Sequence, residues 1–244
     1  MNKLFKIKNF LLDLFFPKFC LGCNREGDFL CENCRTILDI NQHSYCLCDK
    51  PLRLPPNSKI GKCEKCQNKK ISGLFCALSY QENQLTKKLI YQFKYQPYLK
   101  NLAEILASLI AEHLILINKN SNEIWENSVL IPVPIHKKRF NERGYNQSVE
   151  LAKELAKILK TPVVLNCLIK IKSTKPQMEL KKEERQKNLE KAFIIKNTDQ
   201  IRDKKIFLVD DVYTTGSTMQ ECAKILKQAG AKQVWGICIA RDTK

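Results

Sequence analysis

The sequence lacks a long uninterrupted run of apolar residues. Its most apolar stretch near the N-terminus, residues 4–16, contains Lys6, Lys8 and Asp13 and is shorter than the ~20 residues that a membrane-spanning helix needs. The same charges argue against a secretory signal, so we expect a cytoplasmic protein. Apolar residues at helical spacing predict an amphipathic helix over residues 1–18. This helix either docks on the protein or makes weak contact with a membrane surface.

Acidic residues are scarce relative to basic ones. The 244 residues include 42 Lys and Arg but only 25 Asp and Glu, a formal net charge of +17. The excess lies in residues 1–75 and in residues 129–205, and the second segment has 19 basic and nine acidic side chains. This balance favours polyanionic partners such as pyrophosphate or nucleic acid. A general enrichment in lysine would give the same count and would only solvate the surface.

Eight of the 12 cysteines fall between residues 20 and 66, mostly in pairs with two intervening residues. Such a pair can direct both thiolates at one tetrahedral ion, and two pairs complete a four-thiolate zinc site. The first expected set of ligands is Cys20, Cys23, Cys31 and Cys34. The second is Cys46, Cys48, Cys63 and Cys66. Because one residue separates the first two members of the second set, His43 is an alternative ligand there.

Other interpretations of these cysteines stay open. The pairs could be interleaved between two sites, and disulfides or redox chemistry could use the same spacings, although nothing indicates export. We expect a zinc ribbon, double in form, over residues 19–70, with one or two structural ions replacing a core. Residues 67–73 resemble a boundary before a domain over residues 74–244. Four further cysteines in apolar surroundings are expected to be small buried side chains: Cys76, Cys167, Cys222 and Cys238.

The most specific pattern is IFLVDDVYTTGST, residues 206–218. Its four apolar residues predict a buried strand, after which come two adjacent carboxylates, a hydroxyl-rich loop and a helix from about Met219. The N–H groups at a helix start favour a phosphate, whereas two like-charged carboxylates suit sugar hydroxyls or a metal near the sugar. A strand–turn–helix whose hydroxyls only cap the helix would need fewer of them. The segment therefore predicts a site for a phosphorylated sugar.

The rest of the chain alternates strand and helix patterns. Strands are expected at residues 75–80, 129 to about 131 or 133, and 233–240, and helices at residues 85–95, 99–117 and 147–160. This alternation predicts a mainly parallel sheet. A basic loop, residues 136–147, leaves the carboxyl end of a strand, where α/β sheets bind ligands. A solvated loop is the alternative there. The polar residues 172–193 suit either a lid over a phosphorylated substrate or a plain surface loop.

In this order the segments resemble the ComF family, which joins an N-terminal zinc ribbon to a type I phosphoribosyltransferase-like domain. The resemblance covers nearly the whole chain. It rests on LLDLFFPKFCLGC, QFKYQ, IPVPIHKKRFNERGYNQ, STKPQ followed by ERQKN, and the 206–218 motif. It implies an α/β fold with a mainly parallel sheet and helices on both faces. The spacing of Cys46 and Cys48 departs from the family's usual two intervening residues, which leaves the second zinc site open.

The resemblance also implies roles for individual residues. Phosphoribosyl pyrophosphate (PRPP) would bind, with Mg²⁺, to Asp210, Asp211, Val212, Tyr213, Thr214, Thr215, Gly216, Ser217 and Thr218. The two acids would contact the ribose hydroxyls, and the small-residue loop would hold the 5′-phosphate. The pyrophosphate side would be formed by Lys137, Lys138, Arg139 and Arg143, with Asn146 and Gln147 beside them. The lid would carry Thr174, Lys175, Gln177 and Arg185. Lys94 matches a recurrent Lys-Tyr pair without an assigned role.

Three functions are compatible with these features. The first is a protein of DNA uptake in natural transformation that binds PRPP and single-stranded DNA, together with other DNA-uptake proteins. The second is an active phosphoribosyltransferase, a pentosyltransferase whose acceptor and catalytic base the sequence does not identify. The third is a PRPP sensor that uses the zinc ribbon to dock on a protein. The first is favoured by the family resemblance and by the basic segment.

Overall fold

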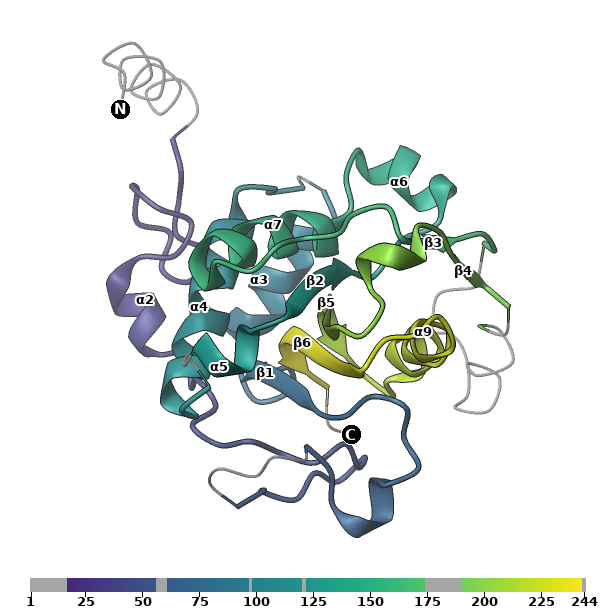
Figure 1. Cartoon of the computed structure of the whole chain (residues 1–244). Helices are drawn as coiled ribbons and strands as arrows, with labels where there is room; N and C mark the ends of the chain where they lie inside the picture. The colour runs from purple at the N-terminus through teal and green to yellow at the C-terminus, as the bar shows by residue number, and fades with distance from the viewer. Residues whose placement is uncertain are drawn as a thin grey trace.

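The computed structural model describes residues 17–55, 61–96, 98–119, 122–173, 189 and 191–242. Within this part of the chain, four parallel strands form a sheet in the order β1-β6-β5-β2 (Figure 1). Their bounds are β1 (Leu74–Ser79), β2 (Ser128–Pro132), β5 (Lys205–Tyr213) and β6 (Gln233–Arg241). The expected mainly parallel α/β sheet is confirmed.

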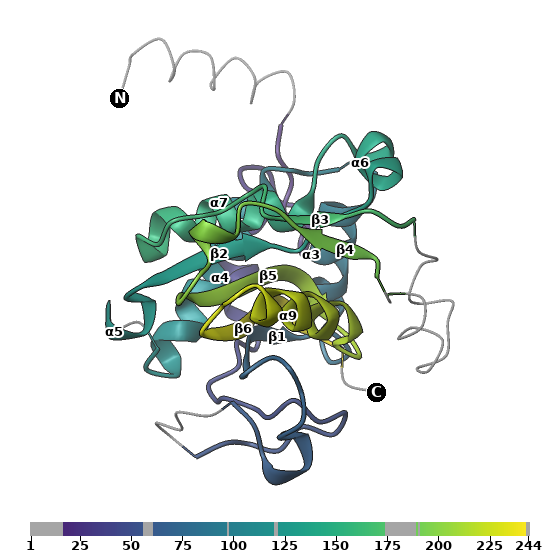
Figure 2. The same cartoon turned by 45° about the vertical axis from the view of Figure 1, so that its right-hand side comes forward.

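Side chains that alternate along β5 explain why both faces of this sheet are covered. Phe207 and Val209 belong to one hydrophobic cluster, whereas Ile206 and Leu208 belong to the other. Helices supply the remainder of each cluster, so the central strand is apolar on both sides. One face carries α3 (Gln84–Lys94), α4 (Leu102–Leu116) and α7 (Gln147–Leu159). The other carries α9 (Ser217–Gln228) (Figure 2).

The segment between β2 and α7 contains a helix that the sequence analysis did not foresee. Here α6 (Lys137–Arg143) occupies most of the expected basic loop. His136 caps its start, because Nδ1 accepts a hydrogen bond from the N–H of Lys138 (3.2 Å), and Gly144 ends it in the left-handed region at φ 76°. The expectation of a loop at residues 136–147 was therefore wrong for this stretch. The strand before it ends at Pro132, as expected.

A second, smaller sheet also went unforeseen. Its two antiparallel strands are β3 (Leu168–Lys170) and β4 (Phe193–Ile195). Phe193 and Leu168 are buried in the same hydrophobic cluster as α9, so this hairpin-like unit lies over the face that α9 covers. The remaining short elements are α2 (Glu32–Thr36), η1 (Glu64–Cys66), α5 (Asn122–Trp125) and η3 (Thr198–Gln200).

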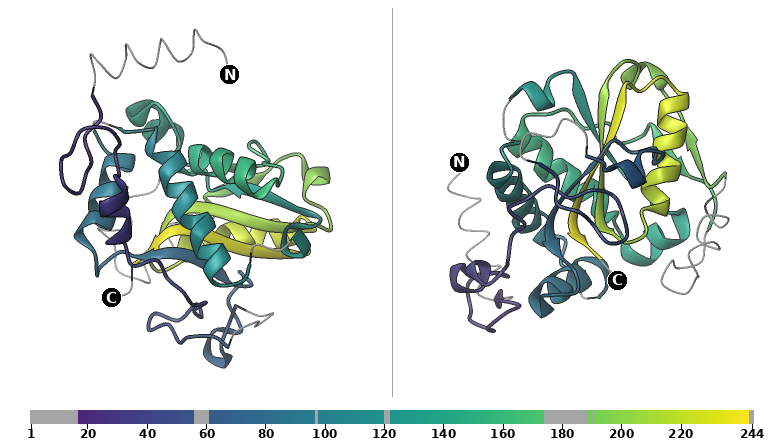
Figure 3. Two further views of the ribbon diagram at one scale, coloured as in Figure 1. Left: turned by 90° about the vertical axis from the view of Figure 1, so that its left-hand side faces the viewer. Right: turned by 90° about the horizontal axis from the view of Figure 1, so that it is seen from below.

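The two cysteine-rich segments pack on different parts of the molecule. The first, which contains α2, lies beside α4, and the second, which contains η1, lies on the far side of β1 from that helix (Figure 3). Cys20 and Cys34 are buried in the cluster with α3, α4 and α7, whereas Cys46 and Cys66 are buried in the cluster with α9. None of the helices within the described ranges is long and apolar enough to cross a membrane. The amphipathic helix expected at residues 1–18 falls almost wholly outside those ranges.

Candidate ligand site and metal centres

The acid pair lies at the carboxyl edge of the sheet, within the last part of β5. The expectation that the strand ends before it was wrong, because β5 continues to Tyr213. Asp210 Oδ1 accepts hydrogen bonds from Ser148 Oγ (3.1 Å) and from the backbone N–H of Asp211 (2.9 Å). Burial, followed by the charge of Asp211, raises the pKa of Asp210 to about 7. Asp210 therefore exchanges its proton near neutral pH.

Lys94, whose role the sequence left unassigned, pairs with the second acid. Lys94 Nζ lies 2.8 Å from Asp211 Oδ1, and the two side chains are only 23% and 12% exposed. Burial lowers the pKa of Lys94, but the charge and hydrogen bond of Asp211 outweigh burial and hold this pKa above its ordinary value. The last residue of α3 thus neutralises one of the two adjacent carboxylates.

The loop between β5 and α9 is built around one glycine. Gly216 has φ 74°, in the left-handed region, and a Cβ there would lie 2.2 Å from Tyr213 Oη. Both conditions require glycine. Thr215 Oγ1 and Ser217 Oγ lie 2.8 Å apart, and the N–H of Ser217 donates to Thr215 Oγ1 (3.4 Å). The helix starts at Ser217, two residues before the expected Met219, so its free N–H groups lie at this loop and favour an anion.

The start of α7 holds the acid pair from the side, and its contacts explain the RGYNQ string. Asn146 Oδ1 caps α7 by accepting from the N–H of Ser148 (3.0 Å), and Asn146 Nδ2 donates to the carbonyl of Val133 (3.1 Å). Tyr145 Oη donates to the carbonyl of Phe93 (2.6 Å), one residue before Lys94. The string therefore fixes α7, α3 and the end of β2 to one another around the acids.

Four cations expected on the pyrophosphate side all lie on α6, with different exposures. Lys137 and Lys138 are exposed, whereas Arg139 and Arg143 are half-buried. Arg143 Nη1 donates to Gln147 Oε1 (3.0 Å), and its guanidinium lies 5.3 Å from the centroid of the Tyr95 ring. These contacts place the C-terminal end of α6 next to the start of α7 and the end of α3.

Lys170 on β3 is a further cation that the sequence analysis missed. Its Nζ lies 5.5 Å from the centroid of the Phe193 ring. Burial and then the positive charge of Arg139 lower its pKa to about 8, while the charge of Asp210 acts in the opposite direction. Lys170 thus lies within electrostatic reach of both α6 and the acid pair. Two half-buried cations that repel one another are a favourable place for a polyanion.

The four lid residues lie outside the described part of the chain, which stops at residue 173 and resumes, apart from residue 189, at residue 191. The predicted roles of Thr174, Lys175, Gln177 and Arg185 therefore stay predictions.

Both four-cysteine sets come together as the favoured pairing predicted. Within each set the ligand atoms all lie within 4.8 Å of one another, and all eight cysteines are free thiols. The first group is Cys20, Cys23, Cys31 and Cys34, here called the first cluster, and the second is Cys46, Cys48, Cys63 and Cys66, the second cluster. His43 belongs to neither. Sγ–Sγ distances of 3.6 Å in the first and 3.4 and 3.7 Å in the second are close to those around a tetrahedral ion.

The single intervening residue in the second cluster has a structural explanation. Leu47 lies between two ligands and is completely buried in the hydrophobic cluster with α9. The thiolates on either side can then approach the same point while the residue between them anchors the loop. Each cluster therefore fits a zinc ion, and Cys76, Cys167, Cys222 and Cys238 are buried as expected.

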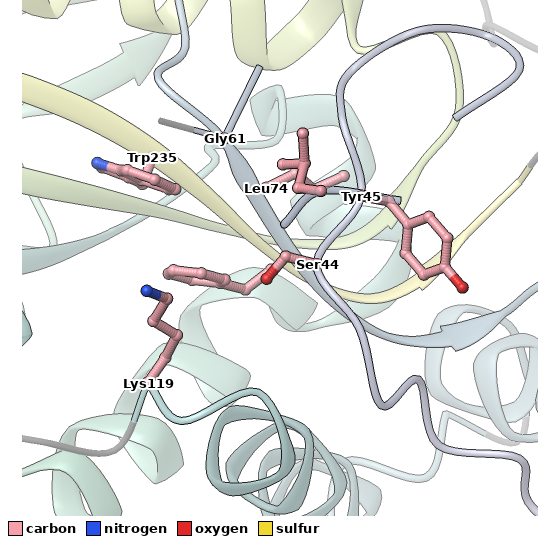
Figure 4. A pocket seen from close by; sticks show the side chains of 8 residues that line it. Ser44, Tyr45, Gly61, Leu74, Lys119 and Trp235 are labelled. Carbon is pink, nitrogen blue, oxygen red and sulfur yellow. The ribbon is translucent and has the colours of Figure 1, made fainter. Parts of the chain in front are cut away.

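A shallow pocket lies away from the acid pair, at the amino end of the sheet. It is lined by residues of β1, β6 and the second cysteine-rich segment, including Tyr45, Leu74 and Trp235 (Figure 4). Here Gly73 passes so close to Trp235 that a Cβ would lie 2.3 Å from its ring. The pocket marks where this segment crosses the sheet. It carries none of the acids or cations described above.

Comparisons with known proteins agree with this geometry. Residues 145–243 match the phosphoribosyl transferase domain model. The chain is 29% identical to Competence protein F of Haemophilus influenzae over 229 residues, which cover 87% of this chain and 98% of the relative. It is 27% identical to the DNA utilization protein YhgH of Salmonella typhimurium, covering 86% and 96%. It is 26% identical to the competence protein ComFC of Bacillus subtilis, covering 84% and 81%. These matches run over more than four fifths of the chain, and together with the domain model they support the ComF family.

Proposed function

We propose that this protein binds PRPP with Mg²⁺ at the carboxyl edge of the sheet and binds single-stranded DNA beside that site, in the cytoplasm, during DNA uptake. The observation that carries the first part is the arrangement of Asp210, Asp211 and Lys94 against the glycine-built loop before α9. The competence and DNA-utilization relatives support the second part.

Each part of PRPP finds a suitable group in this arrangement. The 5′-phosphate would lie at the N-terminus of α9, against Thr214–Thr218, where N–H groups and the helix dipole favour it. The ribose hydroxyls would donate to Asp210 and Asp211. The pyrophosphate would lie toward Arg139 and Lys170. Mg²⁺ prefers substrate phosphates with few protein carboxylates, so it would arrive with the pyrophosphate.

An exposed aromatic and basic strip next to this site suits single-stranded DNA. Tyr91 on α3 and Tyr95, which follows the end of that helix, are 56% and 41% exposed, and their ring centroids lie 5.0 Å apart. Arg143 covers the second ring, and Phe140 on α6 is 48% exposed. Exposed rings between cations stack on bases while the cations contact phosphates. The strip continues from the acid pair through Lys94, so DNA and PRPP would bind side by side.

Calorimetric titration of PRPP with Mg²⁺ into the zinc-loaded protein tests the first part. We expect binding that an Asp210→Asn/Asp211→Asn double variant loses, because the ribose contacts are removed. Undiminished binding by the double variant would refute this placement.

A gel-shift series with single-stranded DNA at increasing salt tests the second part. We expect retention that falls steeply with salt, since phosphate contacts release counterions. A Tyr91→Ala/Tyr95→Ala variant should bind DNA more weakly and PRPP normally. Equal DNA retention by this variant and the wild type would remove the strip from the proposal.

Transfer of the phosphoribosyl group is a second candidate function, favoured by the pKa of Asp210 near 7. A carboxylate with this pKa can accept a proton from an incoming nucleophile at neutral pH. The nucleophile would attack the anomeric carbon, the carbon–oxygen bond to pyrophosphate would break, and pyrophosphate would leave. Pyrophosphate release across a panel of bases and amines tests turnover, and a flat panel would favour binding without catalysis.

A further inference from the structure

Arg241, the last residue of β6, joins the second cluster to the sheet. The side chain is only 7% exposed. Its Nη1 donates to the carbonyl of Cys46 (2.6 Å), and its Nη2 donates to the carbonyl of Cys48. Both acceptors belong to residues that carry the ligand thiols. A buried guanidinium needs hydrogen-bond acceptors, and these two carbonyls supply them. The carbonyls stay in place only while the backbone of residues 46–48 is fixed.

The same guanidinium lies against Tyr213, the residue before the loop of residues 214–216 that would hold the 5′-phosphate, here called the phosphate loop. Arg241 Cζ is 5.5 Å from the centroid of the Tyr213 ring, and the two residues are register partners at the ends of β6 and β5. Tyr213 is 3% exposed, and its hydroxyl lies near the side chain of Gln220. That hydroxyl lies directly beneath Gly216, at the distance that excludes any Cβ there. The position of Tyr213 therefore sets the position of Gly216.

A second connection runs from the other end of the cluster to α9. Gln220 Oε1, in the first turns of α9, accepts hydrogen bonds from the N–H groups of Lys70 (2.5 Å) and Ile71 (3.4 Å). These residues follow Cys66, and Ile71 is completely buried. The first two cysteines of the second cluster and the segment that follows its last cysteine are thus tied to β5 and α9, the two elements that flank the phosphate loop.

We infer that the second cluster, when it holds its metal, positions the phosphate loop through Arg241 and Tyr213. The metal fixes the carbonyls of Cys46 and Cys48, these carbonyls orient Arg241, and Arg241 holds Tyr213 under Gly216. Loss of the metal frees the carbonyls, so the loop N–H groups lose their preorganised arrangement. The inference rests on the proposed function for its consequence, which is metal-dependent PRPP affinity, but the mechanical link exists without PRPP.

Hydrogen exchange in the absence of PRPP tests the link directly. The full-length zinc-loaded protein is compared with Arg241→Met and with the matched control Arg35→Met. Arg35 donates to Ser108 and Glu112 on α4, so it attaches the segment of the first cluster to the fold, as Arg241 attaches the second. We expect exchange of the amides at residues 214–220 to rise about tenfold in Arg241→Met. The same amides should be unchanged in Arg35→Met, and the core of β5 should stay protected in both.

A variant with an intermediate expected effect sharpens the hydrogen-exchange test. Arg241→Lys retains the charge but can hold only one carbonyl well, so its exchange should lie between wild type and Arg241→Met. Equal amide exchange at residues 214–220 in all four proteins would overturn the inference. It would also be overturned if Arg241→Met raised amide exchange by the same factor throughout β5. Calorimetry then separates the two ideas. If wild type binds no PRPP while the exchange pattern holds, the proposed function fails and the link stands.

Discussion

The two clusters each consist of four cysteines, but the segments that carry them contact different parts of the fold. The first cluster attaches through Arg35, which bonds Ser108 and Glu112 on α4, and through apolar residues such as Leu38 in the helical core. The second attaches through the buried Arg241, which lies against Tyr213 at the end of β5, and through Gln220 in α9. Two sets of the same four ligand side chains are therefore attached to different parts of the fold, one to α4 and the other to the strand end and helix that flank the proposed phosphate loop.

Removing one buried ligand from each cluster gives the largest expected effect. Cys34→Ser and Cys66→Ser alter residues that are 4% and 2% exposed, and each is the last cysteine of its cluster. Each variant should lose about one equivalent of zinc, because a structural site needs all four ligands. Cys66→Ser should weaken PRPP binding at least tenfold, whereas Cys34→Ser should change it less than about twofold.

Metal analysis and calorimetry on the two purified variants measure these outcomes. Wild-type protein treated identically serves as the reference, and far-UV circular dichroism checks that the sheet is retained. Similar losses of PRPP affinity in both variants would show that the clusters act only on overall stability, and the contrast between them would disappear.

Two titratable groups on opposite sides of β1 and β6, the buried His113 and the half-buried Asp210, extend the comparison to pH. His113 on α4 is 2% exposed; its Nδ1–H donates to the carbonyl of Asn41 (2.6 Å), and its Nε2 accepts from the N–H of Cys76 (3.3 Å). Burial lowers its pKa to about 4. His113 therefore contributes stability above its unfolded pKa near 6.5, and this contribution is lost as pH falls toward 4. Asp210 acts in the opposite sense: its raised pKa contributes stability below about 4 that is lost as pH rises through about 7.

An Asp210→Asn variant separates the two groups. It removes the penalty of a buried carboxylate, so at pH 8 we expect it to be more stable than wild type by about 1 kcal/mol or more. Between pH 7 and 5 the variant should lose stability more steeply, because the protonation of Asp210 no longer offsets the effect of His113. Urea unfolding of both proteins across pH 5–8 measures the difference, from which zinc effects common to both cancel. A constant offset at every pH would contradict the assignment.

The sequence was sufficient for the mainly parallel sheet, and it favoured the grouping of the cysteines that the structure shows while leaving interleaved pairs open, because both depend on local patterns. The four apolar residues before the two acids predicted a buried strand, which the structure confirms, although the strand does not end where they do. The fully buried Leu47 shows why the unusual one-residue spacing still closes a site. The continuation of β5 to Tyr213 had a signal too, since Val212 and Tyr213 are good strand formers with alternating exposure.

Contacts between distant segments could not be predicted in this way. Arg241 lies in an unremarkable C-terminal string, and its partner Cys46 is 195 residues away. Lys170 likewise becomes part of the site only because β3 pairs with β4 and packs on α9. Hydrophobic periodicity within a segment gives no information on which distant segment it will contact. The segment 67–73, which resembles a linker, contains the buried Ile71 that anchors the second cluster to α9.

Thermodynamic linkage gives a reciprocal and smaller effect on the metal. If the second cluster positions the PRPP site, PRPP must tighten zinc binding at that cluster by the same factor. In equilibrium competition with a chelator, saturating PRPP and Mg²⁺ should lower the fraction of zinc lost from Cys34→Ser, which retains only the second cluster, by a factor of about five to ten. Cys66→Ser, which retains only the first, should show no PRPP effect. If PRPP reduced zinc loss from both variants, it would act by stabilising the whole fold and not through the second cluster.

The smallest expected effect comes from the attachment of the first cluster. Arg35 and Glu112 are 27% and 44% exposed in an ion pair of 2.8 Å, so water and salt screen their attraction. Arg35→Ala should lower the free energy of unfolding by less than about 1 kcal/mol, and raising the salt concentration should shrink that difference further. Urea unfolding at low and high salt measures it. PRPP affinity should stay at the wild-type value, because the partners of Arg35 lie on α4, on the other face of the sheet from Tyr213 and α9. A salt-independent loss of several kcal/mol, or weaker PRPP binding, would mean that the first cluster is coupled to the ligand site as closely as the second, since an exposed ion pair can produce neither result.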